Sequence, residues 1–251
     1  MSASVIYALW IRQVKRYYRS KTRIIGSLGQ PILFLVALGF GFGPIFEAAR
    51  QKTSYVNFLL PGIIAMGSLF VGLFSGVEII WDRQFGFLKE IFVAPISRTE
   101  IMVGRTLGGA TSAFIQGILI FAISIPFDLS ILKMVHPVYF FIFMALIAVT
   151  FTALGTAIAS KLEDMQGFQL IMSLLLMPLF FLSGALFPLE NLPPALQFVT
   201  SLNPLSYGVD GMRASALGIS HFGIYIDFLV LGGFTLIMFI VGTYLFSKIE
   251  L

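Results

Sequence analysis

Several long stretches of this chain carry almost no charged residues, and this pattern excludes most soluble folds. Only 11% of the residues are charged and 58% are hydrophobic, whereas soluble domains carry about a quarter charged residues. Several of the stretches exceed the length of about 18 apolar residues that indicates a bilayer span. The weakly alternating segments of about ten residues that are typical of a transmembrane β-barrel do not dominate. The sequence therefore predicts an all-α, polytopic membrane protein.

The apolar stretches predict six transmembrane helices in a single membrane domain, residues 1–251. The predicted spans are residues 24–46, 56–80, 101–125, 138–160, 168–187 and 224–246. They leave an N-terminal helix at 4–23, a charged loop at 81–100 and a long segment at 188–223 before the last span. Six spans place both termini on one side of the membrane. Most lysines and arginines fall on that side, so the positive-inside bias predicts that both termini and the loop 81–100 are cytoplasmic.

The N-terminal segment has the pattern of an amphipathic helix. Its apolar side consists of Ile6, Leu9, Trp10, Val14, Tyr17 and Tyr18, and its basic flank consists of Arg12, Lys15, Arg16, Arg19 and Arg23. Such a helix can lie in the headgroup plane with its cations toward anionic lipid, a position that suits the aromatic residues. The alternative is a solvated basic tail that only sets the topology. The net charge of +4 is distributed in a way that favours lipid and topology, so no nucleic-acid partner is expected.

The loop 81–100 predicts one short helix from Arg83 to Phe92. Phe85, Leu88 and Phe92 recur at spacings of three and four residues on one side of it, while Lys89 and Glu90 lie away from that line. Pro95 would end the helix, and Ser97 or Thr99 can cap the next span. A helix held between two spans transmits force to both, so the loop predicts a lever that a partner protein could move. The alternative is an interfacial helix that only closes the loop.

Two further charged positions lie near this loop. A carboxylate in hydrocarbon is costly unless it is paired, so Glu78 either extends to water or pairs with a basic residue of the N-terminal helix. Glu163-Asp164 follows Lys161 in a predicted cytoplasmic turn, which is either solvated or a secondary docking contact. Small residues at four-residue spacing, Ser68, Gly72 and Gly76 in one span and Gly104 and Gly108 in the next, permit close helix packing.

The segment 188–223 is too long for a turn and too apolar for a solvated loop. Pro193-Pro194 and Asn203-Pro204 each suit a helix start, which predicts two short helices at about 195–202 and 205–217. Exposed backbone cannot remain unsatisfied in lipid, so these helices must rest at the interface or pack against the bundle as a re-entrant element.

Catalytic chemistry has no support in this sequence. His136 and His221 are isolated in predicted external loops, with no carboxylate at metal-ligand spacing. Loop capping is the expected role of Asp128, Asp210 and Asp227. The alternative is a proton relay, which Asp227 keeps open because it lies close to the last predicted span. The phosphate-binding pattern Gly-x-x-x-x-Gly-Lys-[Ser/Thr] does not occur. We therefore expect no cofactor, no metal and no catalytic residue on this chain. If the protein is driven by ATP, the nucleotide binds to another chain.

Several segments resemble a known transporter family in their order and spacing. Asp82-Arg83-Gln84-Phe85-Gly86-Phe87-Leu88-Lys89-Glu90 with Ala94-Pro95-Ile96-Ser97-Arg98 resembles the first-cytoplasmic-loop signature of type-2 ABC exporter permeases. Ser183-Gly184-Ala185-Leu186-Phe187-Pro188 and Asn203-Pro204-Leu205-Ser206-Tyr207, extending to Arg213, resemble the family's segment between the last two spans. Gln30-Pro31 and Leu60-Pro61-Gly62 resemble its daunorubicin-type, multidrug-resistance branch. The resemblance covers nearly the whole chain.

This resemblance implies a permease with six spans, an interfacial N-terminal helix, a coupling helix in the first cytoplasmic loop and re-entrant helices before span 6. Two permease subunits, here a homodimer, would pair with two ATPase subunits in a prokaryotic cell membrane. ATP and Mg would bind to the ATPase and drive an amphiphilic substrate (drug, lipid or glycolipid) outward. Phe87 departs from the family, which often has a small or hydroxyl residue there.

The resemblance also assigns roles to individual residues. The implied coupling residues are Arg83, Gln84, Phe85, Gly86, Leu88, Lys89, Glu90, Phe92 and Pro95, with Glu163 and Asp164 as a secondary contact and Glu78 as a charge at the span end. The implied residues of the re-entrant segment are Gly184, Pro188, Asn203, Pro204, Tyr207 and Arg213.

Two functions of other classes remain as alternatives. An ion-gradient-driven secondary transporter would need carboxylates near the membrane centre or broken helices at matching positions in two halves, and the spans carry almost no central charge. A membrane-embedded enzyme acting on lipid would need a nucleophile with its base, or a metal site, which the sequence does not show.

Overall fold

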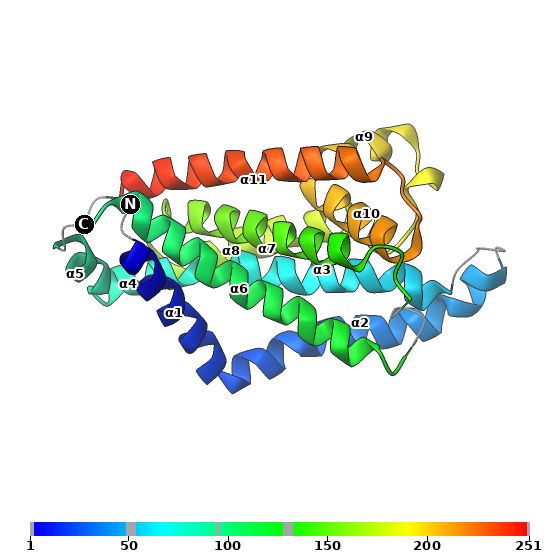
Figure 1. Cartoon of the computed structure of the whole chain (residues 1–251), viewed down its shortest axis with the longest axis horizontal. Helices are drawn as coiled ribbons and strands as arrows, with labels where there is room; N and C mark the ends of the chain where they lie inside the picture. Colours follow the sequence, from blue (N-terminus) through cyan, green and yellow to red (C-terminus); the bar gives the residue numbers. More distant parts are fainter. Residues whose placement is uncertain (1–2, 49–53, 94–95, 128–132, 250–251) are drawn as a thin grey trace.

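The computed structural model describes residues 3–48, 54–93, 96–127 and 133–249, and these contain helices and connecting segments with no β-strand. The long helices run side by side (Figure 1). Their bounds are α1 Ala3–Arg19, α2 Lys21–Ala48, α3 Tyr55–Ser75, α4 Val77–Gln84, α5 Phe87–Val93, α6 Arg98–Ser124, α7 Pro137–Ala159, α8 Met165–Phe181, η2 Leu189–Asn191, α9 Pro194–Leu202, α10 Pro204–Leu217 and α11 Ile224–Ser247. The predicted all-α class is confirmed.

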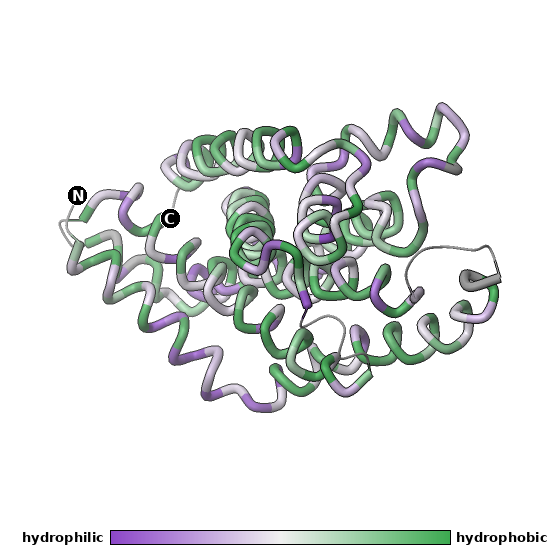
Figure 2. The backbone as a smooth tube through the Cα atoms, turned by 45° about the vertical axis from the view of Figure 1, so that its right-hand side comes forward, coloured by the Kyte–Doolittle hydropathy of each residue, from purple (hydrophilic) through white to green (hydrophobic). Residues whose placement is uncertain are grey.

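Five stretches among the described residues are long and apolar enough to cross a membrane. They are Lys21–Ile45, Tyr55–Gln84, Arg98–Ser124, Pro137–Ala159 and Ile224–Ser247. The remaining predicted span, 168–187, corresponds to α8, which begins and ends earlier and has 17 residues. At 1.5 Å per residue α8 is about 26 Å long, close to the lower limit for a span. Figure 2 shows that the long helices are largely hydrophobic, whereas hydrophilic residues concentrate on α1 and at helix ends.

The central helix of the bundle is α3. It packs against α2, α6, α7, α8 and α10, and almost all of its residues are buried. Its approach to α7 is especially close, because a Cβ atom on Gly155 would lie 2.3 Å from the backbone oxygen of Leu73. At the end of α3, a Cβ atom on Gly76 would lie 2.3 Å from the backbone oxygen of Gly155. The predicted small-residue spacing in this span is therefore used for helix packing.

The N-terminal helix α1 ends at Arg19, and the chain turns at Ser20 into α2, whereas one helix was predicted over 4–23. α1 packs on α6, where Gly104 faces Leu9 and Gly108 faces Gln13. Two polar contacts hold it there: Trp10 Nε1 donates to Thr111 Oγ1 at 2.9 Å, and Tyr17 OH donates to Gln116 Oε1 at 2.9 Å. Burial raises the pKa of Tyr17, while nearby Arg23 lowers it, so the phenol remains a hydrogen-bond donor at neutral pH. α1 is thus anchored to the bundle.

Two short helices, α9 and α10, occupy the chain before α11, as predicted. Both begin with a proline, which suits the first turn of a helix. α10 is buried over nearly its whole length and packs against α3, α7 and α11. It lies at the end of the bundle opposite to α4 and α5 (Figure 1). We call the end that carries α4, α5, the start of α1 and the end of α11 the loop end.

Candidate functional site

The expected single helix from Arg83 to Phe92 is wrong. α4 continues the direction of the second span as far as Gln84, and a separate helix, α5, begins at Phe87. Gly86 between them has φ +77°, a left-handed conformation that glycine adopts without steric cost. The chain therefore turns at Gly86, and the loop is an elbow made of the end of α4, the turn and α5.

The elbow changes which side chains face solvent. Phe85 is 83% exposed, whereas Leu88 is fully buried in the core. The predicted apolar line of Phe85 and Leu88 is therefore wrong, because the turn at Gly86 points the two side chains to different surroundings. Glu90 and Val93 of α5 are exposed. The side chains of Lys89 and Phe92, and the whole of Pro95, lie outside the described residues.

The elbow contacts the turn between α7 and α8, so the structure brings together two predicted sets of site residues. Arg83 Nη2 lies 3.0 Å from Glu163 Oε1, and Gln84 Nε2 donates to the backbone oxygen of Glu163 at 3.2 Å. Asp164 accepts a hydrogen bond from the backbone N–H of Gly167 and so caps α8. The side chain of Glu163 is 77% exposed, and surface ion pairs of this kind contribute about 0–1 kcal/mol to the stability of the fold. The pair therefore sets the relative position of the two loops more than it stabilises the fold.

Glu78, one of the predicted site residues, is buried and paired with basic residues. Its carboxylate lies 3.1 Å from Arg23 Nη1 of α2 and 3.5 Å from Arg16 Nη1 of α1. Of the two expectations, pairing with the N-terminal helix is therefore confirmed, with a second partner on α2. The ion pairs join three helices at the loop end.

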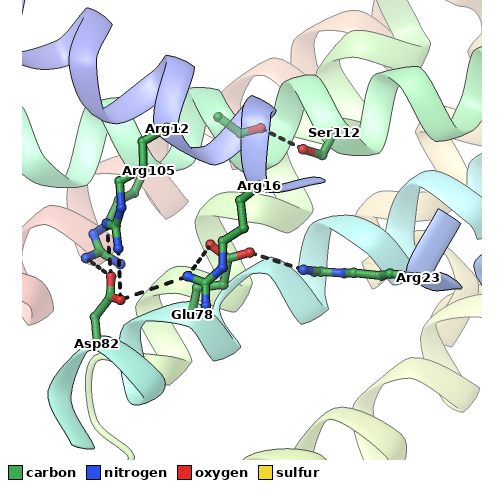
Figure 3. A network of polar contacts seen from close by, with 8 residues as sticks. Arg12, Arg16, Arg23, Glu78, Asp82, Arg105 and Ser112 are labelled. Carbon is green, nitrogen blue, oxygen red and sulfur yellow. Dashed lines mark hydrogen bonds and ion pairs between the residues drawn. The ribbon is translucent and has the colours of Figure 1, made fainter. Parts of the chain in front are cut away.

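Asp82, one helical turn after Glu78, extends this cluster (Figure 3). Its carboxylate lies 3.1 Å from Arg12 Nη2 and also pairs with Arg105 of α6. Arg16 Nη1, already paired with Glu78, is 3.9 Å from Asp82 Oδ1 and so bridges the two carboxylates. We call Glu78, Asp82, Arg12, Arg16, Arg23 and Arg105 the arginine–carboxylate network. It connects α4 to α1, α2 and α6.

Arg105 and Asp82 are the members of this network whose role the sequence analysis missed. Arg105 is only 4% exposed and Asp82 is 5% exposed. The available signal was the matched spacing of four residues in Glu78–Asp82 and in Arg12–Arg16, since residues four apart lie on one helix face. Removing one partner from a buried ion pair lowers the stability of a protein by about 3–5 kcal/mol. This network therefore fixes the positions of the helices at the loop end.

A second contact at the loop end joins α6 to the end of α11. Arg98 Nη1 donates to the backbone oxygens of Ser247 at 2.6 Å and of Ile249 at 2.8 Å. The start of α6 is also fixed by a capping box in which Ser97 and Glu100 exchange hydrogen bonds with each other's backbone N–H. The predicted cap at Ser97 is confirmed.

The predicted residues of the segment 188–223 gather at the opposite end. Buried Arg213 of α10 donates to the backbone oxygens of Phe58 at 3.3 Å and of Gly184 at 3.0 Å, and it stacks over the Phe58 ring at 3.8 Å. Gly184 has φ +71°, so its turn favours glycine. Arg213 thus joins α10, α3 and the turn after α8.

The remaining residues of this segment hold its own helices in place. Asn203 caps α10 by accepting from the backbone N–H of Leu205, and its amide donates to the backbone oxygen of Leu179 at 2.7 Å. Pro204 is the first residue of α10, Pro188 precedes η2, and Tyr207 OH donates to the backbone oxygen of Ser201. The predicted role of Asp210 as a loop cap is confirmed, since it accepts from the backbone N–H groups of His221 and Phe222. These contacts are structural.

The family of the chain follows from its match to a family model. The model described as ABC-2 type transporter matches residues 4–217. The chain belongs to the ABC-2 type transporter family. It is 35% identical over 214 residues to ycf38 of Pyropia yezoensis, whose name describes a transport permease, with 83% of this chain and 72% of that protein covered.

Two bacterial proteins are similar over nearly the full length. Nodulation protein J of Rhizobium leguminosarum bv. viciae is 26% identical over 247 residues, which cover 96% of this chain and 93% of that protein. Inner membrane transport permease YadH of Escherichia coli (strain K12) is 27% identical over 246 residues, which cover 95% and 91%. The chain is thus a membrane-embedded, non-enzymatic permease subunit of an ABC transporter, and the family implies an ATPase partner.

Proposed function

We propose that this permease exports an amphiphilic or hydrophobic substrate, and that its ATPase partner drives it through the elbow at α4–α5. The observation that carries the proposal is the contact of Arg83 and Gln84 with Glu163, which joins two loops into one surface at the loop end. Exposed Phe85, Glu90 and Val93 lie on the same elbow. Aromatic residues and arginine are enriched in protein–protein interfaces, and the elbow carries exposed Phe85 close to Arg83.

The position of the elbow allows a force on α5 to reach the centre of the bundle. α4 follows α3 after a single residue, Gly76, and the two together form the apolar stretch Tyr55–Gln84. A displacement of α5 therefore acts on the most buried of the five candidate membrane spans among the described residues. The arginine–carboxylate network ties α4 to α1, α2 and α6, so these helices would move with it.

The functional unit that we propose contains two copies of this chain and two ATPase subunits, with ATP and Mg bound by the ATPase. Exposed apolar side chains on α2 and α8 support a large apolar contact with lipid or with the second copy. They are Leu33, Val36 and Phe40 on α2 and Leu170, Leu174 and Met177 on α8. We propose the daunorubicin-type branch, in a prokaryotic cell membrane, on the resemblance carried by the motifs Gln30-Pro31 and Leu60-Pro61-Gly62. We propose cytoplasmic termini on the positive-inside bias.

Co-purification tests the coupling surface. The tagged chain is purified from native membranes, and its ATPase subunit is quantified by mass spectrometry. Phe85→Ala/Glu90→Gln should reduce the recovered ATPase several-fold, because both side chains are exposed on the elbow. The matched control is Phe198→Ala/Glu190→Gln, which removes the same groups at the opposite end. Equal recovery of ATPase with both variants would contradict docking at the elbow.

Transport into inside-out vesicles tests direction and energy source. Vesicles that contain the permease and its ATPase should take up a fluorescent amphiphile when ATP is added, and a protonophore should leave the initial rate unchanged. Uptake that follows an imposed ion gradient without ATP would instead support the secondary transporter. The orientation is tested with a reporter that is active only outside the cytoplasm, fused after Leu251. Activity of this fusion would contradict the proposed orientation.

A further inference from the structure

An open, basic cleft lies beside α1 at the loop end. Its volume is about 900 Å³. One wall carries four cations of α1, and the other carries Asp82 and Phe87. The four cations are Arg12, Lys15, Arg16 and Arg19. The lining of the cleft includes Phe87 of the elbow but not exposed Phe85, Glu90 or Val93, which are proposed to meet the ATPase. Asp82, Arg12 and Arg16 of the arginine–carboxylate network also line the cleft.

The positive charge in this cleft exceeds the negative charge available to balance it. α1 contains no acidic residue, and its Arg12 and Arg16 pair with Asp82 and Glu78. Glu78 also pairs with Arg23, and Asp82 also pairs with Arg105. The network thus has four arginines for two carboxylates and a net charge of two positive units.

Lys15 and Arg19 add two more charges to the cleft. Both are exposed, and within the described part of the chain no ion pair is recorded for either residue. They are four residues apart on one helix, where like charges repel each other. An anion held between them would remove this repulsion.

The position of α1 indicates where such an anion would come from. Trp10 and Tyr17 fix α1 to α6, while Tyr7 and Tyr18 are 61% and 78% exposed. α1 leads directly into α2, whose stretch Lys21–Ile45 is long and apolar enough to cross a membrane. The cleft therefore lies at the start of a span, where tyrosine is enriched and where phospholipid headgroups are found.

We propose that the cleft binds the phosphate of an anionic phospholipid, with Lys15, Arg16 and Arg19 as its ligands. Guanidinium groups donate two parallel hydrogen bonds to a phosphate, which suits this chemistry. Asp82 is already paired with Arg12 and Arg105, which leaves the Lys15–Arg19 side for the lipid. Arg16 lines the cleft and also pairs with Glu78 and Asp82 of the network. Anionic lipid would thus stabilise the attachment of α1 to α4, whatever the transported substrate is.

Lipid retention by the full-length chain tests this site. The protein is purified from vesicles of equal parts phosphatidylcholine and phosphatidylglycerol, and the bound lipids are counted by native mass spectrometry. We expect phosphatidylglycerol to be retained over phosphatidylcholine. Lys15→Gln/Arg19→Gln should lower its retention about tenfold, since each basic residue near a membrane surface contributes to the attraction. The matched control, Lys161→Gln/Lys248→Gln, removes two exposed cations outside the cleft and should change nothing.

Several results would overturn the proposal. These are equal loss of lipid in the two double variants, equal retention of the two lipids, or retention of phosphatidylglycerol unaffected by Lys15→Gln/Arg19→Gln. If inorganic phosphate displaces the lipid where chloride of equal ionic strength does not, the ligand is a soluble phosphate instead. If the assembled complex with its ATPase excludes the lipid, the cleft is a protein contact. Should the double variant fold poorly, Arg19→Gln alone, at an exposed position, gives the same comparison.

Discussion

Asp82 of α4 and Arg105 of α6 form a buried ion pair at the loop end of this permease, and Arg12 of α1 completes the pairing of the same carboxylate. Three helices thereby meet at one side chain. The carboxylate lies just before the elbow that we propose as the ATPase contact. Its loss should therefore affect both the stability of the fold and the transmission of force.

Asp82→Asn should lower the free energy of unfolding by about 3–5 kcal/mol, because it leaves the guanidinium of Arg105 buried without its counter-charge. Thermal unfolding of the detergent-purified protein measures the effect. The control is Arg83→Gln, which removes a surface pair with exposed Glu163 and should change the free energy by less than about 1 kcal/mol. Equal effects of the two substitutions would show that the buried network has no special role.

The long helices of this fold could be predicted from the sequence, because a bilayer span requires a continuous stretch of about 20 apolar residues with few charges. Such a stretch is visible in neighbouring residues alone. The sequence also predicted α9 and α10, because Pro194 and Pro204 mark their first turns. The end of the second span was misplaced for a non-local reason. Glu78 and Asp82 remain inside a helix because arginines from α1, α2 and α6 neutralise them. Partners so distant along the chain are not visible in a hydropathy pattern.

The turn at Gly86 was also missed, although the glycine itself was visible. Phe85, Leu88 and Phe92 fit helical spacing, and a glycine inside such a pattern costs only about 1 kcal/mol relative to alanine. The positive φ of Gly86 depends on how α5 packs, since Leu88 and Ile91 are buried in the core. The tertiary packing of α5 therefore outweighs the local helical spacing, and the chain forms an elbow in place of the expected single helix.

Reversal of the charges at the elbow tests the contact between the two loops. Arg83→Glu and Glu163→Arg should each reduce ATP-driven transport several-fold, because each places like charges where a pair 3.0 Å apart now lies. The double variant should recover most of the activity, and thermal stability should change by less than about 1 kcal/mol throughout. A double variant as inactive as the single ones would indicate that the residues act independently.

Glycine at position 155 should be essential for the packing of α7 against α3. Gly155→Ala places a Cβ atom 2.3 Å from the backbone oxygen of Leu73, and such overpacking costs about 1–3 kcal/mol. The matched control is Gly232→Ala on α11, where a Cβ atom meets nothing within 4 Å. That substitution should stabilise the helix by up to about 1 kcal/mol. The two thermal unfolding midpoints should therefore shift in opposite directions, and shifts of the same sign would contradict the close helix approach.

Arg213 should be required for the end of the bundle that carries α10. Arg213→Met retains the apolar length of the side chain but removes its hydrogen bonds to the backbone oxygens of Phe58 and Gly184, and a hydrogen bond to a charged group contributes about 1.5–3 kcal/mol to stability. Arg213→Lys keeps the charge but loses the planar fork that reaches both oxygens, so its cost should be intermediate. Limited proteolysis should then cut between residues 182 and 223 faster than in the unmodified protein, while the loop end remains protected. Faster cleavage at the loop end instead would show that Arg213 supports the whole bundle and not this segment alone.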